Sequence, residues 1–133
     1  MPFEFNFGAG YQLSESLLLS GDFSYATETD VYESVMNMAV GAEYKINSTW
    51  VTRAGFYTNN ANTSDNVAVT GDPNVDLNGV ALSLSRYSKE FNLTLGINHS
   101  RGSGYENLNT GTAHVQDIDV QSTAFFISST SKF

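Results

Sequence analysis

Residues 35–57 constrain the fold of this chain most strongly, because apolar and polar residues alternate along them with a period of two. Strict alternation over this length predicts β-strands and argues against a helix. A tight turn at residues 47–49 divides the stretch into two strands. With a turn of this length, Glu43 lies opposite Arg53, and the apolar residues of both strands share the other face. We therefore expect a hairpin with one apolar face and a cross-strand ion pair on its polar face.

The same alternation recurs along the chain and predicts seven strands. They lie near residues 2–13, 17–27, 34–46, 50–58, 75–87, 91–101 and 120–133. The connections alternate between tight turns near residues 14, 48 and 89 and longer polar stretches near 30, 66 and 110. Short turns on one rim and longer loops on the other are typical of bacterial outer-membrane barrels. We therefore expect an all-β, antiparallel transmembrane β-barrel segment that occupies residues 1–133 as a single domain.

Composition agrees with this class of protein. Charged residues make up only 15% of the chain, whereas about 25% is usual for a soluble globular domain. No run of about 18 apolar residues is present, which excludes a transmembrane helix. The net charge of -8 argues against binding to nucleic acid. Cysteine is absent, so disulfide frameworks and cysteine-based zinc sites are excluded.

The number of predicted strands is odd, which is unusual for a complete barrel. Exported bacterial barrels have an even number of strands, with both ends of the chain on the periplasmic side. Seven strands leave two unpaired edges, which a hydrocarbon environment does not tolerate. We expect the chain to be the C-terminal part of a larger barrel. The alternative is an eighth strand within residues 105–119, where the alternation is poor.

Three segments resemble the C-terminal half of the FadL family of outer-membrane transporters. They are GAGYQLSESLLLSGDFSY (8–25), VGAEYKINSTWVTRAGFY (40–57) and NVDLNGVALSLSRYSKEFNLTLGINHSRGSG (74–104). The resemblance implies a fourteen-stranded barrel, of which seven strands are half. It also implies passive diffusion of long-chain fatty acids or other hydrophobic compounds, without catalysis and without a cofactor. Nothing in this chain matches the N-terminal hatch or the kinked third strand of that family.

Two groups of residues are the candidate sites. Polar side chains on the face opposite the apolar one are expected to form a network that faces the lumen: Glu4, Asp22, Asn37, Glu43 and Arg53. Aromatic side chains near the short turns are expected to lie at the membrane interface: Tyr11, Tyr44, Trp50, Phe91 and Phe133. No residue is expected to be catalytic or to bind a metal, and His99 falls on the outward face without a nucleophile beside it.

These expectations place the protein in the outer membrane of a Gram-negative bacterium. Its expected partners are membrane lipids, lipopolysaccharide, a hydrophobic small molecule as substrate, and the barrel-assembly machinery, which would engage the strand that ends at Phe133. Two other interpretations stay open. One is a small outer-membrane barrel with a structural or adhesive role, and the other is a soluble β-sandwich that acts as a binding module.

Overall fold

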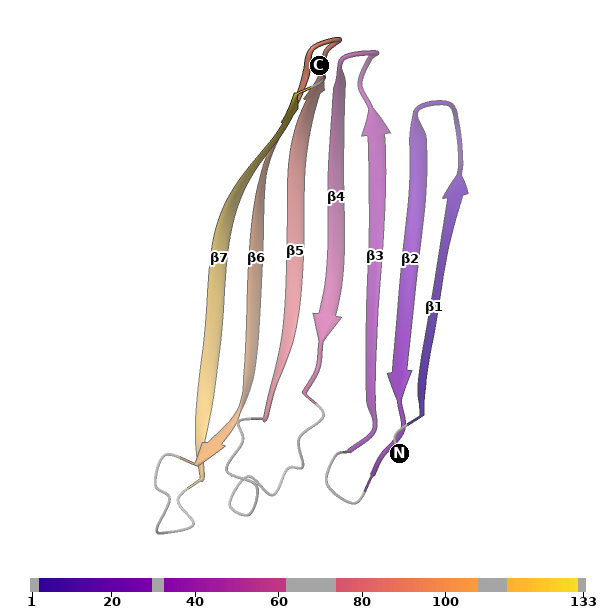
Figure 1. Cartoon of the computed structure of the whole chain (residues 1–133). Helices are drawn as coiled ribbons and strands as arrows, with labels where there is room; N and C mark the ends of the chain where they lie inside the picture. Colours follow the sequence, from indigo (N-terminus) through magenta and orange to yellow (C-terminus); the bar gives the residue numbers. More distant parts are fainter. Residues whose placement is uncertain (1–2, 30–32, 62–73, 108–114, 132–133) are drawn as a thin grey trace.

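The computed structural model describes residues 3–29, 33–61, 74–107 and 115–131, except for the side chains of 106, 107 and 115. These residues form a single antiparallel sheet whose seven strands lie side by side in the order of the sequence (Figure 1). The strands are β1 (Glu4–Gln12), β2 (Leu17–Ala26), β3 (Val35–Lys45), β4 (Trp50–Asn59), β5 (Asn74–Tyr87), β6 (Phe91–Asn107) and β7 (Val115–Ser131). The prediction of an all-β chain with seven antiparallel strands is confirmed. Within the described ranges, no helix has the length and apolar character needed to cross a membrane.

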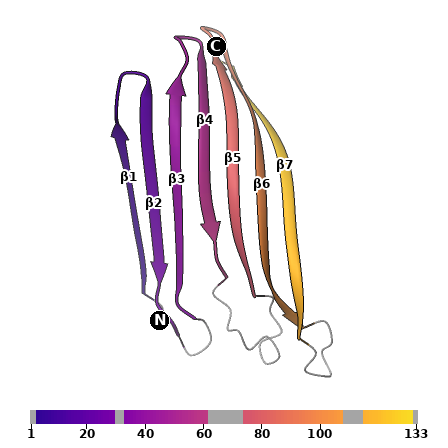
Figure 2. The same ribbon diagram turned by 180° about the vertical axis from the view of Figure 1, so that it is seen from behind.

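The three tight turns lie together at one rim of the sheet, and the longer connections lie at the other (Figures 1 and 2). A short polar side chain holds each tight turn. The side-chain oxygen of Asn47 accepts hydrogen bonds from the backbone N–H of Thr49 at 2.8 Å and of Trp50 at 2.9 Å. Ser14 and Ser88 accept equivalent bonds from the N–H groups of Leu17 and Phe91. Asn and Ser therefore end the strands at these points by replacing ladder hydrogen bonds with local ones.

The register divides the side chains into two faces. Glu43 pairs with Arg53 and Ala42 with Ala54, as the turn length predicted. The apolar face carries the large apolar side chains of all seven strands: Phe5, Phe7, Tyr11, Leu19, Phe23, Tyr25, Met36, Met38, Val40, Tyr44, Trp50, Phe56, Val80, Leu82, Leu84, Phe91, Leu95, Ile97, Phe125 and Ile127. The polar face carries the residues between them in sequence, including Glu4, Asp22, Asn37, Glu43, Arg53, Ser85, Thr94 and Asn98.

The sheet has no hydrophobic core among the described residues. Only Val51, Gly79 and Ser85 are buried among the described residues, and Val51 and Ser85 keep 7% and 1% of their surface exposed. In contrast, Phe125 and Ile127 on the apolar face are 80% and 72% exposed. A single sheet buries an apolar face only when another layer or an apolar medium covers it. The described residues contain no such layer, because all seven strands belong to one sheet.

The last hairpin is longer than predicted. The sequence predicted strands at 91–101 and 120–133 with a polar loop between them, but β6 continues to Asn107 and β7 begins at Val115. Gly102 pairs with Val120 and Gly104 with Ile118, so this part of the expected loop is strand. The described parts of residues 105–119 extend β6 and β7 and do not form an eighth strand. Strand pairing needs only backbone hydrogen bonds, whereas alternation reports apolar residues on one face. In this part of the hairpin, the face that is apolar elsewhere carries Arg101, Ser103 and Gln121, so the strands were predicted too short.

Candidate functional site

The most connected group of polar side chains surrounds Arg53 on the polar face, near the short-turn ends of β4, β5 and β6. Arg53 Nε donates to the carboxylate of Glu43 at 2.7 Å, which is the expected ion pair. Its two terminal nitrogens donate to the hydroxyl oxygens of Ser85 at 2.7 Å and Tyr87 at 2.8 Å. The Ser85 hydroxyl also bonds to that of Thr94 at 2.8 Å. One guanidinium therefore connects four neighbouring strands, from β3 to β6, with its donors directed in the plane of the group.

Ser85 is buried because Arg53 lies over it. A buried hydroxyl without partners would cost about 1–3 kcal/mol, but this one has two, the Arg53 guanidinium and the Thr94 hydroxyl. The sequence identified Glu43 and Arg53 but missed Ser85, Tyr87 and Thr94. The sequence shows small polar residues at alternate positions of β5, but this pattern does not indicate which of them Arg53 contacts.

The other three predicted lumen residues lie on the same face but not in this network. Asn37 accepts a hydrogen bond from the backbone N–H of Asn60 at 2.6 Å, where β4 ends. The Glu4 carboxylate accepts one from the side chain of Asn6, at the far edge of the sheet. Asp22 pairs with Gly8, and its carboxylate covers the space that a side chain at Gly8 would fill. Among the five predicted residues, a direct side-chain bond joins only Glu43 and Arg53.

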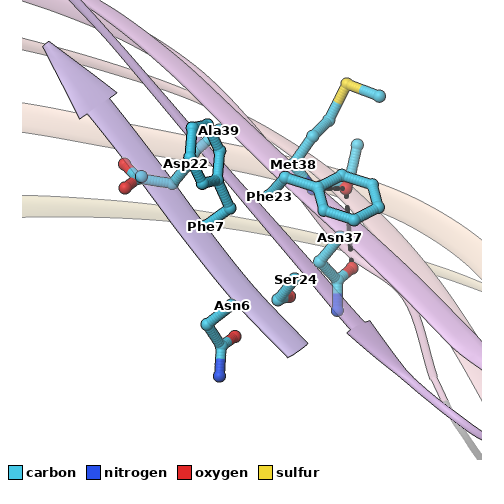
Figure 3. Close-up of a pocket in the computed structure, with 10 residues that line it drawn as sticks. Asn6, Phe7, Asp22, Phe23, Ser24, Asn37, Met38 and Ala39 are labelled. Atoms are coloured by element: carbon cyan, nitrogen blue, oxygen red, sulfur yellow. Dashed lines mark hydrogen bonds between the residues drawn. The ribbon is translucent and has the colours of Figure 1, made fainter. Parts of the chain in front are cut away.

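A shallow hollow of about 320 Å³ lies beside Asp22, over β1, β2 and β3 (Figure 3). Its lining includes Asn6, Asp22, Ser24 and Asn37, and Figure 3 draws the 3.5 Å hydrogen bond from Thr58 to Asn37 at one side. Asp22 forms no ion pair with another described side chain. The hollow therefore gives the polar face a second region, with one carboxylate, that shares no residue with the network of Arg53.

Two aromatic rings also lie on the polar face, each over a glycine of the neighbouring strand. The Tyr57 ring covers Gly79, and its hydroxyl donates to Asn98 Oδ1 at 3.0 Å. The Phe126 ring covers Gly96 in the same manner. A side chain at either glycine would overlap the ring, so the glycines make room for the aromatic groups. The sequence did not identify Phe126 as a residue of the polar face, because the adjacent Phe125 and Ile127 indicate an apolar surface on the opposite face.

The predicted aromatic residues gather near the short turns. Tyr11, Tyr44, Trp50 and Phe91 are all exposed on the apolar face, within two residues of a tight turn. Phe133 lies outside the described residues, although β7 ends at Ser131, which pairs with Phe91 at the same rim. The sequence missed Arg86, whose guanidinium carbon lies 6.0 Å from the ring centroid of Trp50 and 5.8 Å from that of Phe91.

One histidine of the apolar face lies beside a hydroxyl group. His99 Nδ1 lies 2.8 Å from the hydroxyl of Thr123, and the pair is exposed. In the part of the chain that is described, no three His, Asp or Glu side chains converge to hold a metal ion. The described residues therefore provide an apolar face, a polar face, and one hydrogen-bonded network of polar side chains around Arg53.

Comparison of the chain with family models, curated proteins and solved structures finds no match.

Proposed function

We propose that this chain forms part of the wall of a bacterial outer-membrane β-barrel, with its apolar face against lipid and its polar face toward an aqueous lumen. One observation carries the proposal: large apolar side chains are exposed across all seven strands, while almost nothing is buried. A soluble monomer rarely exposes an apolar patch larger than a few hundred Å². Hydrocarbon covers such a face without any specific partner, because lipid chains adapt to the shape of the protein.

The lengths of the strands support the same proposal. A strand that crosses the hydrocarbon core at a tilt needs about 9–11 residues. The shortest strand, β1, has 9 residues, and β6 and β7 have 17 each. All seven strands are therefore long enough to cross the core.

The position of the apolar residues also supports tilted strands. One row of paired residues crosses the whole sheet: Ala9, Gly21, Val40, Phe56, Val80, His99 and Thr123. On β1, most apolar side chains lie between this row and the long connections, from Phe3 to Phe7. On β6, they lie between the row and the short turns, from Phe91 to Ile97.

The apolar band therefore runs obliquely to the rows of hydrogen bonds. Its centre shifts toward the short turns from β1 to β6, as expected for strands that are tilted from the membrane normal. Strands of outer-membrane barrels tilt by about 35–45° from the membrane normal. The band is level in the membrane if the strands of this sheet are tilted in the same way.

The two edges of the sheet call for further strands. Within the described residues, β1 bonds only to β2, and β7 only to β6. Unpaired backbone groups are not tolerated in hydrocarbon. Because β1 and β7 run in the same direction (Figure 1), a wall that is antiparallel throughout needs an odd number of strands between them. A longer chain or a neighbouring chain would supply these strands.

For the cargo, we propose long-chain fatty acids or other hydrophobic compounds that diffuse passively through the barrel. Two observations support this cargo. Residues 8–25, 40–57 and 74–104 resemble the FadL family, and the proposed lumen face carries both polar and apolar side chains. That face carries the exposed apolar side chains of Phe126 and Val120 beside its polar groups.

Single cysteines along β3 test the wall directly, because the chain contains no other cysteine. Spin labels at Val40 and Ala42 should collide with oxygen, which concentrates in lipid, and labels at Ala39 and Gly41 should collide with a water-soluble nickel complex. Labels at Val40 and Ala42 that collide with neither reagent, in a protein that stays soluble without detergent, would establish the β-sandwich instead, because a second sheet would then cover the apolar face.

Uptake measurements test the cargo separately. Cells that carry the protein should accumulate a fluorescent long-chain fatty acid faster than cells without it, and uptake of a fluorescent sugar should not change. A correct pattern of spin-label exposure without any uptake of fatty acid would leave the wall intact and reject the cargo.

A second candidate function is a structural or adhesive barrel, and the length of β6 and β7 favours it. Beyond His99 and Thr123, both strands continue toward the long-connection rim with polar residues on the outward face, such as Arg101, Ser103 and Gln121. This hairpin would rise above the membrane as a paired ribbon. Binding of cells to a surface, abolished by removal of the ribbon while fatty-acid uptake persists, would select this function.

A further inference from the structure

We propose that Arg86, held between Trp50 and Phe91 on the apolar face, binds the phosphate of a glycerophospholipid at the short-turn rim. The inference rests on the proposed function, because it requires the apolar face to contact lipid. It adds a binding site at Arg86 and a ligand group, the phosphate. It also places the short-turn rim at the level of the lipid headgroups.

The position of Arg86 is unusual for a charged residue. It lies directly between Trp50 of β4 and Leu93 of β6, and it follows Leu82 and Leu84 along the apolar face of β5. Arg86 is exposed and forms no ion pair with any described carboxylate. A cation at the centre of a bilayer is costly, whereas one at its boundary reaches the headgroups with its charged end while its stem stays among apolar groups.

The two rings fix the guanidinium without using its donors. Its central carbon lies 6.0 Å from the ring centroid of Trp50 and 5.8 Å from that of Phe91. Cation–π contacts at this distance attract the charge to the rings. They leave the N–H groups available, and a guanidinium offers these in a planar fork that matches two oxygens of a phosphate.

The surroundings select a lipid as the source of the phosphate. Trp and Tyr are the residues that proteins place at the headgroup level, and Trp50 and Tyr44 are exposed on the apolar face at this rim. Leu84 and Leu95 lie next along the same face, toward the middle of the strands. A phosphate that is joined to acyl chains satisfies the guanidinium and the leucines together, whereas free phosphate satisfies only the guanidinium.

The test uses the full chain in vesicles of phosphatidylcholine with phosphatidylglycerol. After transfer to detergent, the lipids that remain bound are counted by native mass spectrometry. Substitution of Arg86→Gln should lower the retention of phosphatidylglycerol by about tenfold, and Arg86→Lys should lower it less, because lysine keeps the charge but loses the planar fork. Diacylglycerol, which has the same chains and no phosphate, should not be retained by any variant.

Lys89→Gln is the matched control, because Lys89 is an exposed cation of the adjoining turn that no described ring contacts. Its retention of lipid should stay within twofold of the original. Equal losses for Lys89→Gln and Arg86→Gln, or no loss for Arg86→Gln, would overturn the site. Displacement of the lipid by excess inorganic phosphate would also overturn it.

The single tryptophan of the chain separates this proposal from the one on which it rests. Lipids brominated in their chains should quench Trp50 in the original protein and in Arg86→Gln alike. No quenching in the original protein would reject the membrane wall itself. Quenching in both proteins, with equal retention of phosphatidylglycerol, would reject only the phosphate site.

Discussion

The two faces of the sheet differ in the kind of interaction that their side chains make. On the polar face, Arg53 alone makes three side-chain bonds at 2.7–2.8 Å, and each bond goes to a different strand or position. In the middle of the apolar face, side chains such as Val40 and Leu82 make only non-directional contacts and stay about half exposed. Directed side-chain bonds on the polar face join particular strands, whereas the contacts of the apolar face are non-directional and, under the proposed function, are made to lipid.

This contrast has consequences for mutations. A face that interacts with an apolar solvent should tolerate changes of shape and reject changes of polarity. A face held by directed bonds should do the reverse, because each donor needs its acceptor at a fixed distance. The following experiments test this difference, starting with the largest expected effect.

Substitution of Val40→Arg should destabilise the protein in phospholipid vesicles by about 3 kcal/mol, since Arg near the midplane of a barrel wall costs about 2–4 kcal/mol. Ala39→Arg is the control on the adjacent residue, because its side chain points to the polar face beside Asp22. It should cost less than 1 kcal/mol. Denaturant titrations in vesicles measure both values, and similar costs for the two variants would contradict the assignment of the faces.

Replacement of Arg53 by Met should destabilise the protein by about 2 kcal/mol, because Glu43 and Ser85 each lose a partner. Lys45→Met removes a cation from an exposed end of β3 and should have almost no effect. A double-mutant cycle with Glu43→Gln isolates the ion pair, and we expect a coupling free energy of about 1 kcal/mol. A coupling near zero would mean that Arg53 acts only through Ser85 and Tyr87.

Substitution of Gly79→Ala should cost about 1 kcal/mol, because the added methyl group displaces the Tyr57 ring and breaks its bond to Asn98. Gly55→Ala is the control, since a methyl group there meets the carbonyl oxygen of Val40 at an ordinary 3.4 Å. In the background of Tyr57→Ala, the cost of Gly79→Ala should disappear. A cost that persists in this background would point to the backbone and not to the ring.

The smallest effect is expected for Met38→Leu on the apolar face. A swap that conserves volume usually costs less than about 1.5 kcal/mol in a packed core, and against lipid we expect less than about 0.5 kcal/mol. Ser85→Ala, which removes only a hydroxyl from the polar face, should cost about 1–2 kcal/mol because Arg53 and Thr94 lose a partner. Equal costs for both would show that the apolar face packs against protein.

Much of the fold could be predicted because the chain alternates with few interruptions. The tight turns at residues 14, 48 and 89 place the strands in register, and the pairing of Glu43 with Arg53 follows from one turn length. The long hairpin of β6 and β7 could not be predicted, because in its outer half the face that is apolar elsewhere carries polar residues such as Arg101, Ser103 and Gln121. Alternation identifies only the part of a strand that has an apolar surface on one side.

The candidate sites divide in the same way. The sequence placed Glu43 and Arg53 together because they lie on one hairpin. It could not place Ser85, which bonds to Arg53 from a position 32 residues further along the chain, or Thr94, which bonds to Ser85. It also missed Arg86, since a single charge at the end of an alternating strand looks like part of the next turn.

The sequence by itself determined the strands, the turns and the face to which each residue points, because the backbone of a strand turns successive side chains to opposite sides. Only the tertiary structure decided which side chains meet across strands. Partners such as Arg53 and Ser85, or Arg86 and the rings of Trp50 and Phe91, depend on the register of several strands at once. A shift of one residue in the register of β5 against β4 would move these groups to opposite faces, so their meeting depends on the pairing of strands from different hairpins.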